Sequence, residues 1–194
     1  MNYDILIAGV GGQGTILASR LLATAALDAG FFTRTSETIG MAQRGGCVVS
    51  HVRIGNEASP IIPPKHTDLL IGFEPGEAAR NIGSLSANGI CIVNTRPIMP
   101  VTASLGNMSY EVESIYEYIK LKVAAAIFVD AYSLAEEAGS VKTINVVLLG
   151  VATATGHLPL SRETIERVIA ENVPKRYMDL NSKAFKLGFE SQNK

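Results

Sequence analysis

The 194-residue chain has little of what marks several classes of protein. It has no tryptophan, only 2 cysteines, and 18% charged residues that sum to a formal net charge of -1. A charge so near zero offers no basic surface for nucleic acid or for an anionic membrane. Because 47% of the residues are hydrophobic, intrinsic disorder and low-complexity sequence are also excluded. We therefore expect a globular protein with no affinity for nucleic acid or membranes.

The two cysteines, Cys47 and Cys91, form no CxxC pair, no zinc-ligand set and no iron–sulfur run. Both lie in apolar, β-branched stretches, CVVSHV and ICIV, where a thiol is usually a small buried hydrophobe. The apolar run at the N-terminus is too short for a signal peptide or a membrane span. These features predict a cytoplasmic chain that holds no metal ion or cluster of its own.

No long linker or internal repeat divides the chain, and its length suffices to build one substantial core. We therefore expect a single domain over residues 1–194. Its mean hydropathy of +0.22 is high for a free monomer of this size, which favours an interface with another subunit.

Short apolar runs alternate with segments of helical periodicity along the chain. This alternation predicts an α/β protein, a Rossmann-like three-layer α/β/α domain with a mostly parallel sheet. The expected strands cover residues 3–8, 31–36, 47–54, 68–73, 90–94 and 125–130. Residues 37–46 are expected to form a loop. The expected helices cover 13–29, a segment from Pro75, 112–119, a segment ending at Gly139, 144–155, 161–172 and 181–189. Because residues 144–155 are apolar on every side, they should be buried against the sheet or a partner.

The first expected strand runs into a glycine-rich turn that matches GxGxxG and opens a helix. Gly9 would permit the tight turn, and Gly11 the close approach of a ligand or another backbone. Gly14 would let the helix pack on the strand. The free N–H groups of Gly12, Gln13 and Gly14 would then face an anion.

A dinucleotide site also needs an acidic residue about 20 residues further on, at the end of the second strand. Asp28 has that spacing but lies on the expected helix, and Glu37 lies at the start of the expected loop. Three interpretations of the turn therefore stay open: an NAD or FAD site, a site for another ligand, and a purely structural turn.

A second candidate segment is GMAQRGG, in which Arg44 precedes Gly45 and Gly46. Arg44 could bind a carboxylate or phosphate, and the glycines could let backbone N–H groups approach an anion or a partner chain. Equally, Arg44 could be a surface residue before a β-bulge.

The three histidines, His51, His66 and His157, are isolated from one another in the sequence. Without an HxxH, HExxH or GxSxG motif, each is expected to be structural or solvated. No catalytic residue can be nominated, so the chain has no evident catalytic machinery of its own.

Four segments together carry a resemblance to a known family: GVGGQGTILASRLLATAA, SETIGMAQRGGCVVSHVRIG, DLLIGFEPGEAAR and LNSKAFKLGFE. They resemble the gamma-type subunit of 2-oxoacid:ferredoxin oxidoreductases over essentially the whole chain. Within that family, GMAQRGG followed by SHVRIG is most like the beta subunit of the indolepyruvate enzymes.

The resemblance implies a subunit of a complex that decarboxylates an aryl 2-oxoacid with coenzyme A (CoA) and reduces ferredoxin. It also implies a large partner subunit that holds thiamine diphosphate, magnesium and the 4Fe-4S clusters. The glycine turn and the Arg44 loop would then lie at one edge of the sheet, facing the large subunit, and shape the approach of substrate or CoA.

Other interpretations predict different proteins. A gamma subunit for pyruvate, 2-oxoglutarate or branched-chain 2-oxoacids would keep the family and change the substrate. A free-standing nucleotide-binding protein would bind NAD, FAD or ATP by itself, and a regulatory module would sense a small anion.

Overall fold

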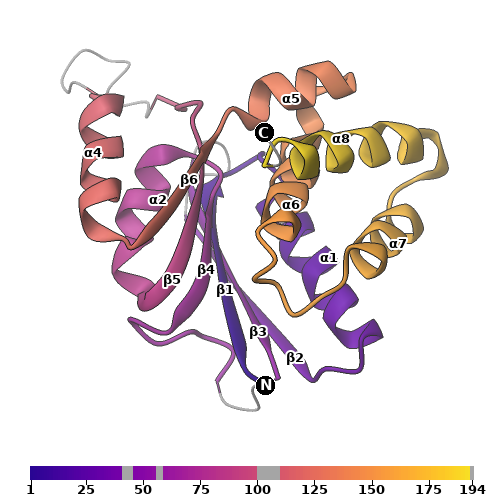
Figure 1. Cartoon of the computed structure of the whole chain (residues 1–194), viewed down its shortest axis with the longest axis horizontal. Helices are drawn as coiled ribbons and strands as arrows, with labels where there is room; N and C mark the ends of the chain where they lie inside the picture. The colour runs from indigo at the N-terminus through magenta and orange to yellow at the C-terminus, as the bar shows by residue number, and fades with distance from the viewer. Residues whose placement is uncertain (41–45, 56–58, 100–109, 193–194) are drawn as a thin grey trace.

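The computed structural model describes residues 1–40, 46–55, 59–99 and 110–192. In this part of the chain a twisted six-stranded sheet lies between two layers of helices (Figure 1). The strands are β1 (Tyr3–Val10), β2 (Thr33–Ile39), β3 (Cys47–Ile54), β4 (Thr67–Gly72), β5 (Leu85–Asn94) and β6 (Ala125–Val129).

The strands lie in the order β2-β3-β1-β4-β5-β6. β1, β4, β5 and β6 are parallel neighbours, whereas β3 is antiparallel to both β1 and β2. Among the described strands, β3 alone therefore runs against the others. The expected α/β fold with a mostly parallel sheet is confirmed.

Of the described helices, five cover one face of the sheet and two cover the other (Figure 1). On the first face lie α1 (Thr15–Asp28), α5 (Ala131–Ala138), α6 (Ile144–Ala154), α7 (Arg162–Asn172) and α8 (Met178–Glu190). On the second lie α2 (Pro75–Asn81) and α4 (Val112–Lys122). Single 3-10 turns, η1 (Ile82–Ser84), η2 (Val141–Thr143) and η3 (Lys175–Tyr177), join several of these elements. None of the described helices is long and apolar enough to cross a membrane.

Several strand ends, including the start of β2 at Thr33, differ from the sequence prediction by one or two residues, and pairing extends two strands further than that. β2 continues to Ile39, which pairs with Val48 of β3, so the prediction that residues 37–39 belong to a loop is wrong. β5 begins at Leu85, five residues before the expected start at Ile90, because Leu85 pairs with Thr67 across an irregular step. The strand propensity of a residue does not tell which strand it will pair with, so these extensions could not be predicted.

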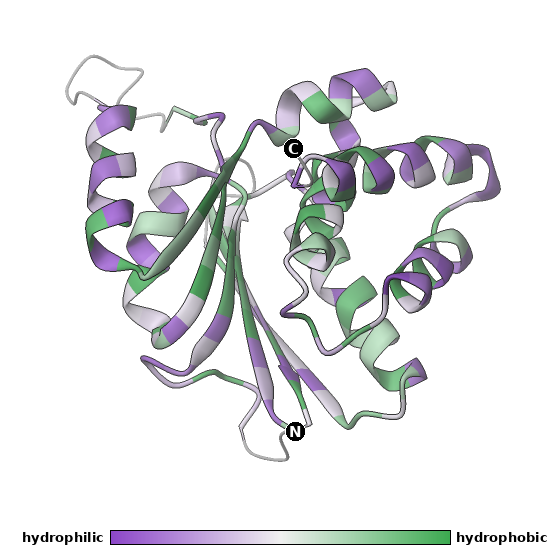
Figure 2. Ribbon diagram, in the orientation of Figure 1, coloured by the Kyte–Doolittle hydropathy of each residue, from purple (hydrophilic) through white to green (hydrophobic). Residues whose placement is uncertain are grey.

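The apolar helix α6 lies in the core of its own domain. Every residue from Asn145 to Thr153 is buried, and Figure 2 shows hydrophobic residues around most of the helix. A methyl group on Gly150 would lie 2.2 Å from the carbonyl oxygen of Phe185 on α8. The backbones of α6 and α8 therefore approach too closely for any larger residue at this position.

The two cysteines lie in different environments. Cys91 is buried in the middle of β5, and burial raises its pKa to about 12. Cys47 is exposed at the start of β3, so the prediction of a buried thiol is wrong there. Alternation puts Cys47 on the same face as Val49 and His51, which are only half-buried because α2 and α4 cover the β4–β6 half of that face.

Candidate functional site

The glycine turn joins β1 to α1 at the carboxyl edge of the sheet, where ligands of open α/β sheets commonly bind. Gly12 and Gly14 have φ angles of +98° and +82°, a conformation that favours glycine. Gly14 is the N-cap of α1 and leaves the end of that helix without a side-chain cap. A methyl group on Gly14 would lie 3.0 Å from Nδ2 of Asn145 on α6.

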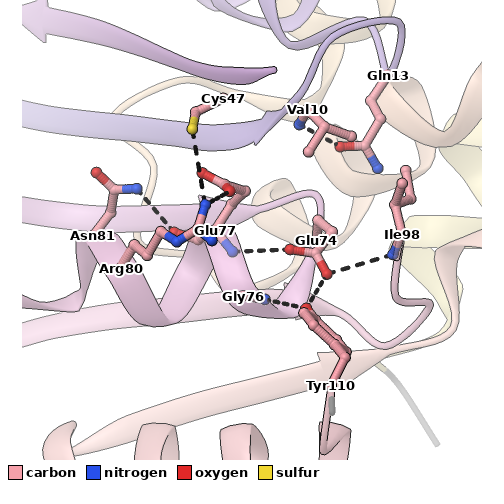
Figure 3. A network of polar contacts seen from close by, with 10 residues as sticks. All are labelled: Val10, Gln13, Cys47, Glu74, Gly76, Glu77, Arg80, Asn81, Ile98 and Tyr110. Carbon is pink, nitrogen blue, oxygen red and sulfur yellow. Dashed lines mark hydrogen bonds and ion pairs between the residues drawn. The ribbon is translucent and has the colours of Figure 1, made fainter. Parts of the chain in front are cut away.

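Within this turn, the side chain of Gln13 folds back onto the protein (Figure 3). Its Oε1 accepts the N–H of Val10 at 2.8 Å, and its Nε2 donates to the carbonyl oxygen of Phe73 at 2.9 Å. A methyl group on Gly9 would lie 2.8 Å from both Gln13 Oε1 and Phe73 Cβ. The N–H of Gln13 donates to Val10 O at 3.3 Å, so it is not free, contrary to the prediction.

The two glycine-containing segments of the sequence meet at one hydrogen bond. The N–H of Gly11 donates to the carbonyl oxygen of Gly46 at 2.9 Å, so another backbone approaches Gly11. Arg44 and Gly45 lie outside the described residues. Their predicted part in an anion site therefore remains a prediction.

Beside the turn, a pocket of about 450 Å³ opens between the glycine turn, the segment after β5 and the start of α6. The residues that give it chemical character are Gly12, Gly14, Arg96, Tyr132, Lys142 and Asn145. No aspartate or glutamate is among its described lining residues. The N-termini of α1 and α6 both border the pocket, and the partial positive charge at helix N-termini attracts anions.

Arg96 is held in the wall of this pocket by aromatic stacking. Its guanidinium carbon lies 3.8 Å from the ring centroid of Tyr132. The preceding residue is fixed on both sides: the Thr95 N–H donates to Val129 O at 2.9 Å, and the Tyr116 hydroxyl donates to Thr95 O at 2.6 Å. A guanidinium that lies over a ring keeps the N–H groups at its own edge available, and these groups can bind phosphate or carboxylate.

Asn145 lines the pocket, is only 3% exposed and forms no hydrogen bond with another described residue. The described side-chain atoms that are fully buried without a partner belong to Tyr3, Ser50 and Thr67, so the amide of Asn145 is not sealed off from the pocket. It can therefore bond to water or to a ligand there. By contrast, Asn94, 1% exposed, donates to Phe73 O at 3.0 Å and accepts the Ala131 N–H at 3.2 Å.

The acidic residues considered for a ribose lie away from the pocket. Asp28, at the far end of α1, forms an ion pair with Arg167 at 3.1 Å. Glu37 lies on β2, which β3 separates from β1. Its carboxylate accepts a hydrogen bond from the Ser19 hydroxyl at 3.3 Å. The strand order therefore removes the adjacency that a ribose-binding acid requires.

The histidines contribute no site within the described part of the chain. His51 Nδ1 accepts the Ile62 N–H at 3.3 Å, and its pKa is lowered by burial first and by Arg53 second. His66 and His157 lie in a turn and a loop, both exposed. Among the described residues no three His, Cys, Asp or Glu side chains gather to hold a metal ion.

Sequence reasoning missed the pocket residues Arg96, Tyr132, Lys142 and Asn145. A signal for Arg96 was present, because it follows the predicted strand ICIVN closely, and residues after parallel strands face the ligand edge. No local pattern marks Asn145, since its position in the site depends on α6 packing behind Gly14.

Comparisons with known proteins agree on one family. The family model "Pyruvate ferredoxin/flavodoxin oxidoreductase" matches residues 4–191. Indolepyruvate oxidoreductase subunit IorB of Pyrococcus horikoshii is 42% identical over 193 residues, which cover 98% of this chain and 96% of the relative. The subunit of the same name from Archaeoglobus fulgidus is 40% identical over 190 residues, covering 97% and 94%.

Solved structures agree with this fold. Pyruvate oxidoreductase subunit PORC from Thermotoga maritima is 26% identical with a TM-score of 0.72, covering 97% of this chain and 96% of that one. The 2-oxoglutarate:ferredoxin oxidoreductase from Magnetococcus marinus, solved with 2-oxoglutarate, coenzyme A and succinyl-CoA bound, has a TM-score of 0.73 at 21% identity. That match covers 98% of this chain and 31% of that chain, and its low identity shows the fold alone. The chain belongs to the pyruvate ferredoxin/flavodoxin oxidoreductase family and is a small subunit of a 2-oxoacid:ferredoxin oxidoreductase.

Proposed function

We propose that this subunit assembles with a large subunit into an oxidoreductase for indolepyruvate and related aryl 2-oxoacids. Identity of about 40% to two indolepyruvate oxidoreductase subunits, over nearly the full length of both chains, supports this substrate class. The large subunit holds thiamine diphosphate, magnesium and the 4Fe-4S clusters, and passes electrons to ferredoxin. CoA accepts the acyl group.

Within that complex, the pocket beside the glycine turn binds the phosphate-bearing end of CoA. The observation that carries this proposal is a set of donors in one pocket that have no hydrogen-bond acceptor among the described residues: the side chains of Arg96, Lys142 and Asn145, together with two helix N-termini. Because these groups donate or carry positive charge, they fit the anionic end of CoA. Binding energy from this remote part would hold the reactive thiol near the large subunit.

The rim of the pocket supports its position at a subunit interface. Leu17, Ile98 and Val141 line the pocket and remain 41%, 39% and 37% exposed. Met99, next along the wall, is 48% exposed. Exposed apolar residues around a charged pocket are typical of a surface that another chain covers. The Arg44 loop would extend this surface, since Gly46 contacts the glycine turn.

The first test is co-expression with the large subunit, followed by an assay of CoA-dependent ferredoxin or viologen reduction. Indolepyruvate, phenylpyruvate, pyruvate and 2-oxoglutarate are compared as substrates. Activity with the aryl oxoacids that needs both chains is the expected result. Activity with pyruvate or 2-oxoglutarate alone would contradict the substrate class, and failure to form a complex would contradict the proposed partner.

The second test separates the pocket from the complex as a whole. Arg96→Ala should raise the KM for CoA and leave the KM for the oxoacid unchanged. Arg162→Ala is the matched control, because Arg162 also lies over an aromatic ring, 4.4 Å from the centroid of Phe189, but on α7. An unchanged KM for CoA in Arg96→Ala would overturn the pocket assignment.

A further inference from the structure

A buried carboxylate, Glu74, contacts Ile98 (Figure 3), which forms one wall of the pocket together with Arg96 and Pro97. Glu74 is the N-cap of α2 and is only 3% exposed. Its Oε2 accepts the N–H of Glu77 at 2.9 Å, which is an ordinary cap. A cap of this kind uses a single side-chain oxygen, so the second oxygen of Glu74 is available for another contact.

That second oxygen joins two other segments of the chain. The N–H of Ile98 lies 3.4 Å from Oε1 of Glu74, and the hydroxyl of Tyr110 donates to the same oxygen. Tyr110 in turn accepts the N–H of Gly76 at 3.0 Å. Burial and the hydrogen bond to Glu74 raise the pKa of Tyr110, so its hydroxyl keeps its proton and remains a donor. One carboxylate therefore ties the pocket wall and Tyr110 to the start of α2.

The sequence around Glu74 is adapted to this arrangement. A methyl group on Gly76 would lie 2.7 Å from Oη of Tyr110 and 3.1 Å from Oε2 of Glu74. Any larger residue at position 76 would displace the tyrosine from the carboxylate. The backbone here is ordinary, so the glycine is required by space and not by conformation.

The residue before Glu74 supports the opposite side of the same pocket. The carbonyl oxygen of Phe73 accepts hydrogen bonds from Nε2 of Gln13, in the glycine turn, and from Nδ2 of Asn94, at the end of β5. The dipeptide Phe73–Glu74 thus anchors the glycine turn, the end of β5 and the wall after β5. These are three of the segments that line the pocket.

We propose that Glu74 is a positioning residue for the pocket: its Oε1 holds Ile98 and Tyr110 and so fixes where Arg96 presents its guanidinium. The proposal rests on the proposed function, because its consequence is measured as affinity for CoA. The length of the side chain is the decisive property. An aspartate would cap α2 equally well but would be one methylene too short to reach the wall.

Two substitutions separate the wall contact from the helix cap. Glu74→Asp keeps the charge and the cap but withdraws Oε1 from Ile98 and Tyr110. Glu74→Gln keeps the reach, because the amide oxygen can still accept from Ile98 and Tyr110, but directs an NH₂ group at the N–H of Glu77. The matched control is Glu77→Gln, which removes a second buried carboxylate of α2, one that pairs with Arg80 instead of the wall.

The experiment uses the complex with the large subunit. In Glu74→Asp, amide hydrogen exchange of residues 95–99 without CoA should be at least about fivefold faster, because a lost hydrogen bond lowers local protection. The KM for CoA should rise about tenfold, since small misplacements of binding groups are costly, with kcat and the oxoacid KM within about twofold. Glu74→Gln should lower the melting temperature more than Glu74→Asp, and keep the KM for CoA within about threefold of the wild type.

Three results would overturn the proposal. These are unchanged exchange in residues 95–99 of Glu74→Asp, a larger rise in the KM for CoA in Glu74→Gln than in Glu74→Asp, and an equal rise in Glu77→Gln. Arg96→Ala distinguishes the two levels of inference. If Arg96→Ala leaves the KM for CoA unchanged, the proposed function fails, while the exchange measurement still decides whether Glu74 holds the wall.

Discussion

The two ends of the parallel strands each hold an arginine, and the two arginines have different partners. At the amino end, Arg53 and Asp4 are buried and fully paired: Nε and Nη2 of Arg53 donate to the two carboxylate oxygens at 2.9 and 2.8 Å. Nη1 of the same arginine donates to Ser59 O at 2.7 Å. At the carboxyl end, Arg96 stacks on an aromatic ring and Asn145 lacks a described partner.

This difference separates structural polar groups from groups available to a ligand. A buried ion pair whose hydrogen-bonding groups are all used serves the fold, because the loss of either member leaves the other charge buried without a partner. An unsaturated set leaves hydrogen-bonding capacity for another molecule. Substitutions at the two ends should therefore differ in whether they change stability or ligand binding.

Arg53→Met should lower the free energy of unfolding by about 3–5 kcal/mol, because the buried Asp4 carboxylate loses its partner. Urea denaturation followed by circular dichroism measures this change. The double variant Asp4→Leu with Arg53→Met should recover part of the loss, since no charge is then left unpaired. A single variant as stable as the wild type would show that the amino end is not held by this pair.

Arg96→Ala should raise the KM for CoA by roughly 10- to 100-fold, the effect of losing about 1.5–3 kcal/mol from a charged hydrogen bond. The melting temperature should stay within about 2 °C, because none of the described ion pairs includes Arg96. The KM for CoA of Arg96→Lys should lie between those of the wild type and Arg96→Ala. Lysine keeps the positive charge but lacks the planar guanidinium that can donate two parallel hydrogen bonds. A melting temperature that falls together with CoA affinity would assign Arg96 to structure.

The two buried asparagines that line the pocket, Asn94 and Asn145, should respond differently to the same substitution. Asn94→Leu should destabilise the protein by about 1–3 kcal/mol, because Phe73 O loses one of its donors and the Ala131 N–H loses its acceptor. Asn145→Leu should leave stability within about 0.5 kcal/mol and weaken CoA binding, because Asn145 has no described partner to lose. Equal destabilisation by both variants would contradict the distinction.

The smallest effect concerns the pH dependence of the amino end. The pKa of His51 is lowered in the folded chain, so the unfolded chain binds more protons between the folded pKa and 6.5. The contribution of neutral His51 to the free energy of unfolding is therefore fully present above pH 6.5. It is lost as the pH drops from 6.5 through the pKa of His51 in the folded chain. Urea midpoints at pH 7.5, 6.5 and 5.5 should show this fall in the wild type and a smaller one in His51→Gln, while equal slopes would contradict it.

Much of the fold could be predicted from local pattern. Strand β1, the buried helix α6 and the Ser161 cap of α7, whose hydroxyl accepts the Thr164 N–H at 3.1 Å, follow from hydrophobic period and capping chemistry. The extension of β2 to Ile39 could not be predicted, because it depends on pairing with β3. Likewise, only the uneven cover of the sheet distinguishes exposed Cys47 from buried Cys91.

The candidate site divides in the same way. The glycine turn could be found from the spacing of its glycines, but the contacts that require each glycine could not be predicted. Gly9 makes room for Gln13 and Phe73, and Gly11 bonds to Gly46, contacts between residues distant in the chain. In the sequence, Glu74 is only an acidic residue before the helix predicted from Pro75. Its contacts with Ile98 and Tyr110 depend on how distant segments pack.

By itself, the sequence determined the α/β class, the position of the glycine-rich turn and the family, because periodicity, glycine spacing and motif combinations are local properties of the chain. The tertiary structure decided which donors have acceptors within the described part of the chain and which have none there. Hydrogen-bond saturation depends on neighbours from distant segments, and it is this property that distinguishes Arg53 from Arg96 and Asn94 from Asn145.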